Sequence, residues 1–159
     1  MSKPKRTKQE VDELIASRCL SVSGTYAWKA KCALWCGFEI RVSSSNPKYA
    51  RLRITVTCRA DKGKASMCLL WESLRVRAYC IRGNHDNKHT NESSWLKANH
   101  AHVWTDTCAD RLAEDIVGEC ITDGDMQKNV GCFLSYCGIM GDVIVLDMPL
   151  SQGDYLDEV

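Results

Sequence analysis

The chain has 159 residues, 45% of them apolar, and its 21 Lys+Arg nearly balance its 20 Asp+Glu. This length favours a single domain with its own hydrophobic core, and no apolar stretch approaches the roughly 18 residues that a membrane-spanning helix needs. Composition therefore excludes collagen-like, coiled-coil, mainly disordered and membrane-spanning proteins, and we expect a soluble protein.

The first predicted element is a short helix near the N-terminus. Thr7-Lys8-Gln9-Glu10 fits a capping box, in which the hydroxyl and the carboxylate each accept a hydrogen bond from an otherwise unpaired backbone N–H. Apolar residues then recur at helical spacing, at Val11, Leu14, Ile15 and Cys19. No apolar signal segment accompanies the basic residues before this helix, so we expect no secretion.

A series of strands follows, each recognised by alternation of apolar and polar residues. Even positions from Tyr26 to Val42 are apolar, which predicts one long bent strand or two strands joined near Gly37. Further alternations predict strands with apolar positions at Leu52, Ile54, Val56 and Cys58, at Met67, Leu69 and Trp71, and at Leu74, Val76, Ala78 and Cys80. Trp28 and Trp71 lie on apolar faces and are expected in the core.

The C-terminal part combines strands and helices. Residues 100–104 predict a short strand with Ala101 and Val103 toward the core, and residues 106–120 have a partly helical pattern. A better-marked helix begins at Asp123 or Asp125 and ends at Gly138, and residues 143–146 suggest a closing strand. We therefore predict an α+β fold, with a mainly antiparallel sheet of about five or six strands, an N-terminal helix and one or two C-terminal helices. Residues 1–150 would form one domain and residues 151–159 an acidic flexible tail.

Charge is distributed unevenly along the chain. Residues 1–98 carry 19 Lys+Arg and 8 Asp+Glu, a net +11, whereas residues 99–159 carry 2 and 12, a net −10. The first part could present a basic surface to nucleic acid, or the two parts could pack together and neutralise each other. The ten cysteines include no Cys-x2-Cys pair, which favours reduced core thiols in a cytosolic protein over a zinc knuckle.

All four histidines lie within 18 residues, at His85, His89, His100 and His102. His100 and His102 would share one face of a strand, and Arg75 and Arg77 would join that face if neighbouring strands pair antiparallel. Two histidines of ordinary pKa can serve as general base and general acid, and arginine can stabilise a phosphorane-like transition state. The cluster thus predicts metal-free cleavage of a phosphodiester, with Arg75 and Arg77 binding phosphate.

Other interpretations of the cluster stay open. A His-ligated divalent metal, with Asp86 or Asp106 as a further ligand, fits the residue types, although no cofactor is required by the sequence. The cluster could also bind phosphates and stacked bases without chemistry, with Trp95 and Trp104 as the stacking residues. The simplest alternative is a set of solvated bystander histidines. A Cys–His nucleophile using Cys80 or Cys108 is the weakest candidate.

Four short segments resemble an uncharacterised family of small phage and bacterial proteins. They are residues 9–15 (QEVDELI), residues 75–77 (RVR), residues 100–104 (HAHVW) and residues 133–139 (FLSYCGI), in the family's order. The family's Asn-Pro-Asp-Gly turn is absent, and its His-x-Asn motif matches both His85 and His89. The layout of strand, His-rich loop and His-rich strand is similar, more distantly, to that of TumE-type toxins of toxin–antitoxin pairs.

The resemblance and the histidine cluster together predict a phage or mobile-element accessory protein. It would act on RNA or a nucleotide phosphodiester, as a toxin-like ribonuclease or as a degrader of a host immune nucleotide. The alternative is a non-catalytic anti-defence inhibitor that sequesters a nucleotide signal or binds a host defence complex, such as a CRISPR complex, through its acidic part. Expected partners are RNA or a small nucleotide, a host defence protein or a cognate antitoxin, in the cytoplasm of the cell or host and without a membrane.

Overall fold

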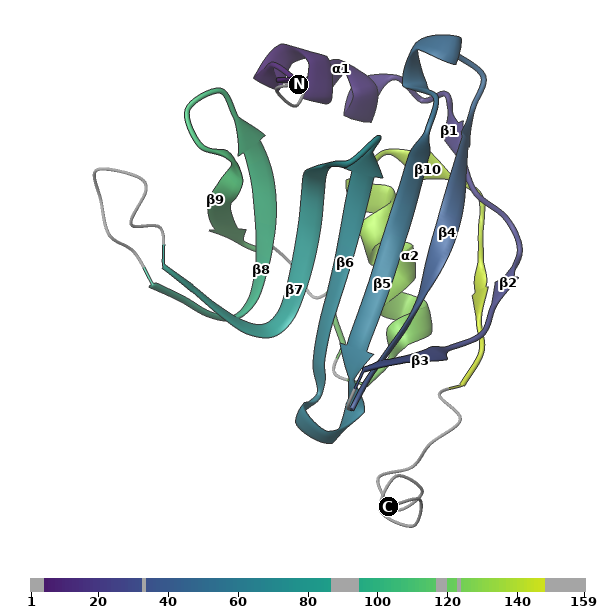
Figure 1. Cartoon of the computed structure of the whole chain (residues 1–159), viewed down its shortest axis with the longest axis vertical. Coiled ribbons are helices and arrows are strands. Elements are labelled where there is room, and N and C mark those ends of the chain that lie inside the picture. Colours follow the sequence, from purple (N-terminus) through teal and green to yellow (C-terminus); the bar gives the residue numbers. More distant parts are fainter. Residues whose placement is uncertain (1–4, 33, 87–94, 117–119, 123, 148–159) are drawn as a thin grey trace.

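The computed structural model describes residues 5–32, 34–86, 95–116, 120–122 and 124–147, with the backbone alone at residues 60, 84–86 and 95–98. Within these residues the chain is α+β, with two helices and a large, curled, mostly antiparallel sheet (Figure 1). The predicted fold class is therefore confirmed. The main sheet has nine strands, more than the five or six expected.

The first helix, α1, spans Lys8–Ala16 and begins as the sequence predicts. The Thr7 hydroxyl accepts a hydrogen bond from the backbone N–H of Glu10, and the Glu10 carboxylate accepts one from the backbone N–H of Thr7. Val11 and Leu14 on its apolar stripe are buried. The helix lies across one end of the strands (Figure 1) and closes that end of the core.

The main sheet runs in the order β10-β1-β4-β5-β6-β7-β8-β9, with β3 paired to β4 outside this path. Its strands are β1 (Leu20–Ser21), β3 (Lys29–Cys32), β4 (Trp35–Ser44), β5 (Leu52–Arg59), β6 (Lys64–Trp71), β7 (Leu74–Asp86), β8 (Trp95–Thr105), β9 (Ala109–Asp115) and β10 (Ile139–Met140). Neighbours pair antiparallel, except that β1 and β10 pair parallel. A second, two-stranded sheet joins β2 (Thr25–Tyr26) and β11 (Ile144–Val145) in parallel. Short 3-10 turns occupy Pro47–Tyr49 and Ala60–Lys62.

Two predicted elements differ from the structure. The long alternation divides into β2, β3 and β4. β3 ends at Cys32 and β4 begins at Trp35, so the strands do not join near Gly37. Gly37 lies inside β4, where a Cβ atom would be only 2.4 Å from the Val56 carbonyl oxygen, so its glycine permits close strand approach. The segment expected to be partly helical contains β9 instead.

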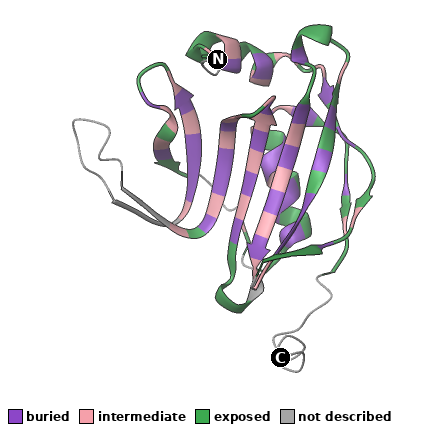
Figure 2. Cartoon of the chain, viewed as in Figure 1, coloured by how far each residue is buried: buried purple, intermediate pink, exposed green. Residues whose placement is uncertain are grey.

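The second helix, α2, spans Met126–Tyr136, with Asp125 as N-cap. It covers one face of the sheet and buries Val130, Phe133 and Leu134 against alternate residues of the strands (Figures 1 and 2). Trp28 and Trp71 are buried in the core, as predicted. The opposite sheet face carries no helix in the part of the chain that the structure describes. No helix among these residues is long and apolar enough to cross a membrane.

Candidate functional site

The two histidines of β8 lie beside Cys80 on the sheet face opposite α2. Cys80 pairs directly with His100 across β7 and β8, and His102 pairs with Ala78 one step further along. The His100 and His102 rings are 5.0 Å apart, centroid to centroid. One potential ligand atom from each of Cys80, His100 and His102 lies within 4.8 Å of the others. The predicted histidine pair is thus brought together, with a thiol as its third member.

Both histidines are buried: His100 is 2% exposed and His102 is 5% exposed. This burial excludes the alternative of solvated bystanders on an outer sheet face. Beside His100 the pairing of β7 with β8 is irregular between Cys80 and Gly83, where Arg82 has φ 53° and its backbone N–H donates to the Asn99 side chain. The bend brings Gly83 onto the His100 ring, and a Cβ atom at Gly83 would lie 3.2 Å from Cε1 of His100.

The neighbouring strand β9 determines that Nδ1 of the His102 ring carries a proton. Nδ1 of His102 is 3.0 Å from the backbone carbonyl oxygen of Asp110. Because a carbonyl oxygen can only accept, Nδ1 carries a proton and donates it to Asp110. The Asp110 carboxylate in turn forms an ion pair with the Arg75 guanidinium. Burial would lower the pKa of Arg75, but the hydrogen bond to Asp110 and the charge of Asp110 together raise that pKa.

The Cys80 thiol has a polar environment on one side. Ser66 Oγ lies 4.0 Å from Cys80 Sγ and 3.5 Å from Cys68 Sγ. Burial raises the pKa of Cys80, and the hydrogen bond to Ser66 and the charge of Arg75 oppose that rise. Cys80 is therefore a protonated thiol near neutral pH, within reach of two imidazoles.

The two arginines predicted to bind phosphate lie on opposite faces of the sheet. A bulge in the pairing of β6 with β7 places Leu69 opposite Arg77 and Leu70 opposite Arg75, with Val76 between them. Arg75 therefore faces Asp110 and the histidines. Arg77 faces α2, where its Nη1 donates to the Tyr136 carbonyl at 2.7 Å and its guanidinium stacks 4.3 Å from the Tyr136 ring. The expectation that both share the histidine face is wrong for Arg77, because the bulge shifts the alternation by one residue.

The other predicted site residues are placed less fully. The His85 backbone pairs with Leu96, and the Trp95 backbone pairs with Asp86, but both side chains are outside the described residues, as is all of His89. The choice between His85 and His89 therefore stays open. Trp104 is only 9% exposed, and its Nε1 donates to the Arg6 carbonyl, so little of its ring is open to a stacked base.

The alternation in the sequence assigns Cys80 to the apolar core face and ranks a Cys80–His pair as the weakest candidate, whereas the structure places this thiol beside both histidines. The α2-facing positions of β7 are Arg77, Tyr79 and Ile81, and the tyrosine ring lies 5.2 Å from that of Phe133. The available signal was that Tyr79 and Ile81 form an apolar alternation as good as that of Ala78 and Cys80.

One disulfide, Cys120–Cys132, differs from the expectation that all cysteines are reduced thiols. All ten cysteines are described, and the other eight form no disulfide.

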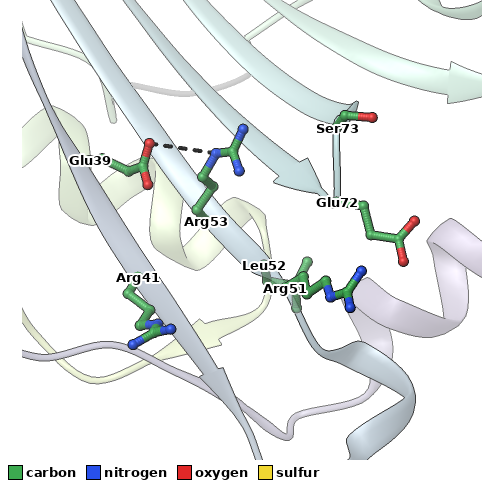
Figure 3. Close-up of a pocket in the computed structure, with 7 residues that line it drawn as sticks. All are labelled: Glu39, Arg41, Arg51, Leu52, Arg53, Glu72 and Ser73. Carbon is green, nitrogen blue, oxygen red and sulfur yellow. Dashed lines mark ion pairs between the residues drawn. The ribbon is translucent and has the colours of Figure 1, made fainter.

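A basic hollow lies on β4 and β5 (Figure 3). It has a volume of about 770 Å³ and is lined by Glu39, Arg41, Arg51, Leu52, Arg53, Glu72 and Ser73. Arg41 and Arg53 are direct cross-strand partners, an arrangement in which like charges repel. Arg53 also pairs with Glu39 at 3.5 Å, and Glu72 pairs with Arg6 at 3.5 Å. Among the described residues, Arg41 and Arg51 have no ion pair with an acidic group.

Two residues that line the hollow have a strained backbone, and a second hollow adjoins it. Arg51 and Glu72 both adopt left-handed φ values, 61° and 58°, and the Glu72 N–H donates to the Arg51 carbonyl at 3.0 Å. A second hollow, of about 640 Å³, shares Glu39 with the first and adds Lys29 and Lys31. We call the two together the basic groove. Its five cationic side chains face two carboxylates, so it attracts anions.

Comparisons with known proteins give no match. No protein-family model, no curated protein and no solved structure resembles the chain significantly. Proposals about function therefore stand on the sequence and the geometry described above.

Proposed function

We propose that this protein binds RNA or another phosphodiester ligand along the helix-free face of its sheet. The observation that carries the proposal is the basic groove, in which Arg41 and Arg51 have no acidic partner among the described residues. Guanidinium groups bind phosphate oxygens through paired N–H donors, and the strained Arg51 backbone holds one of them at the rim. The net +11 of residues 1–98 agrees with a polyanionic ligand.

The sequence also predicts cleavage, with His100 and His102 as acid and base and Arg75 as a phosphate clamp. One contact supports this finer proposal: Asp110 binds Arg75 through its carboxylate and His102 through its carbonyl, so both side chains have fixed orientations. Such a ribonuclease would agree with the resemblance to TumE-type toxins and with a phage or mobile-element accessory role in the cytoplasm. Arg77, held by Tyr136 on the other face, takes no part in it.

Burial of the two histidines favours the second candidate, binding without cleavage. A polymeric substrate cannot reach rings that are 2% and 5% exposed without opening the β7–β9 curl. In this version the groove sequesters RNA or a nucleotide signal, as an anti-defence inhibitor would. If the protein instead inhibits a host defence complex, it would bind that complex through acidic side chains. Glu114 and Asp115 are exposed on β9.

Fluorescence anisotropy of labelled single-stranded RNA tests the binding proposal. Arg41→Gln should weaken binding several-fold and lower the slope of log affinity against log salt by about 1, because one phosphate contact is lost. Lys128→Gln removes one positive charge from the exposed side of α2, on the opposite face of the sheet. It should leave the affinity and the salt slope nearly unchanged. Equal losses in the two variants, or no RNA binding by the native protein at low salt, would contradict the proposal.

The same binding measurement with DNA of the same sequence and with cyclic dinucleotides identifies which phosphodiester binds best. Chromatography with mass detection on the same samples separates the two candidates. New RNA products that disappear in His102→Ala would establish cleavage. Binding that survives in His102→Ala, with no products from the native protein, would establish sequestration.

A further inference from the structure

We propose that Cys80, His100 and His102 bind one transition-metal ion, with Zn²⁺ as the best match. The three side chains offer one sulfur and two nitrogen donors from the adjacent strands β7 and β8. Thiolate and imidazole are the ligands that zinc prefers in proteins, whereas Mg²⁺ and Ca²⁺ prefer oxygen. The inference goes beyond the proposed function and does not depend on it.

The spacing of the three donors suits a tetrahedral ion. They lie within 4.8 Å of one another. Ligand atoms arranged tetrahedrally at bond lengths of roughly 2.0–2.3 Å are about 3.5 Å apart, so each side chain needs to move by less than about 1 Å. Direct pairing of Cys80 with His100, and the shared strand face of His100 and His102, hold the backbone positions in place.

The surroundings of the donors have the features of a metal site. A metal-binding histidine usually donates its other ring N–H to a carbonyl or carboxylate, which fixes the ring and its tautomer. His102 does this with the Asp110 carbonyl at 3.0 Å, so Nε2 is the ring nitrogen that would bind the metal. The Asp110 side chain is itself held by Arg75, so β9 is anchored where it orients His102. Both histidines are buried, so their rings are held in place by the surrounding protein.

Metal binding has a definite proton balance. The Cys80 thiol loses one proton to solvent when its sulfur bonds to the metal, and the two neutral imidazoles lose none. Affinity should therefore rise with pH, with about one proton released for each metal ion bound.

Three protein ligands leave a fourth position on a tetrahedral ion for water or a ligand oxygen. Ligation would also occupy the ring lone pairs that acid–base catalysis requires. If the histidines bind metal, any chemistry on a phosphodiester would depend on the metal and not on proton transfer by the rings. The metal site and the basic groove can thus be tested separately.

Titration of the reduced full-length protein with Co²⁺, followed by competition with Zn²⁺, tests the site. We expect one equivalent of Co²⁺ to give a sulfur-to-cobalt charge-transfer band and intense tetrahedral d–d bands, which Zn²⁺ abolishes. Cys80→Ser should lose the charge-transfer band and bind metal more than about 100-fold more weakly. Cys19→Ser changes another half-buried thiol, just before β1, and should keep the band.

A second measurement covers the case in which Cys80→Ser fails to fold. Zinc that binds only the native state should raise the melting temperature of the unmodified protein, increasingly with zinc concentration. Absence of both a cobalt band and a zinc-dependent shift in the native protein would overturn the proposal. A charge-transfer band that persists in folded Cys80→Ser would overturn it too. Neither result would affect RNA binding by the basic groove.

Discussion

Phe133 is the aromatic residue of α2 that is most deeply packed against the sheet. It is fully buried, and its ring lies 5.2 Å from Tyr79 and 6.4 Å from Tyr136. Phe133→Ala should lower the free energy of unfolding by about 3–5 kcal/mol, because it leaves a cavity that the sheet cannot fill. Urea denaturation measures this. Ser135→Ala, at an exposed position of the same helix, should change it by less than about 0.5 kcal/mol.

A buried thiol and a buried phenol limit the stability of the fold at alkaline pH. Burial, reinforced by nearby Cys36, raises the pKa of Cys58 from 9.0 to about 11, and burial raises that of Tyr79 from 10.0 to about 12. At alkaline pH the folded state therefore keeps these two protons, whereas the unfolded state has already lost them. Their stabilisation is therefore complete below pH 9 and is lost as the pH rises toward 12.

Urea midpoints measured across this pH range should fall steadily above pH 9. Cys58→Ala removes one of these buried groups and should flatten the part of the profile between pH 9 and 11. A native profile that stays level up to pH 11 would show that the thiol is not protected as the structure indicates.

At the scale of elements, the end of α2 depends on one glycine. Gly138 follows the helix with φ 66°, and a Cβ atom there would lie 2.1 Å from the carbonyl oxygen of Ile15 in α1. Gly138→Ala should destabilise the fold by more than about 1 kcal/mol, through backbone strain and through displacement of α1 from α2. Thermal unfolding measures this. Gly131→Ala lies within α2 with open space around it and should be neutral or slightly stabilising.

Elements with strict periodicity were predictable, and those with register shifts were not. The capping box at Thr7 and the N-cap at Asp125 were found because local side chains determine them. The strands around Ile54 and Leu69 were found because one face is buried throughout. The bulge at Val76 and the irregularity before Gly83 depend on tertiary pairing, so the sequence alone could not place Arg77 on the α2 face. Burial of His100 and His102 by the curl was missed for the same reason.

At the scale of the whole molecule, electrostatics should matter more for binding than for folding. The ion pairs Lys8–Asp12 and Lys48–Glu13 join side chains that are about half exposed, and such pairs contribute little to stability. The basic groove has the opposite character, since two of its arginines lack acidic partners among the described residues.

Added NaCl should therefore separate the two properties. Raising it from low to near-molar concentration should change the free energy of unfolding by less than about 1 kcal/mol, while RNA affinity falls by several orders of magnitude. Parallel urea titrations and anisotropy measurements across the same salt series check this. A fold that loses stability as steeply as RNA binding would indicate that groove charges stabilise the native state.

The parallel pairings of β1 with β10 and of β2 with β11 have a consequence for the order of folding. The strands in each pair are separated by almost the whole described chain, whereas β4 to β9 pair with sequence neighbours. β1 can pair early with β4, its antiparallel neighbour, but the parallel contacts of β1 with β10 and of β2 with β11 must wait for the C-terminal strands, because closing a long loop is slow. Pulsed hydrogen exchange during refolding should therefore protect amides in β5 and β6 before that of Val22, which donates to the Met140 carbonyl. The β1–β10 edge and the β2–β11 sheet would be the last parts of the molecule to become resistant to proteases.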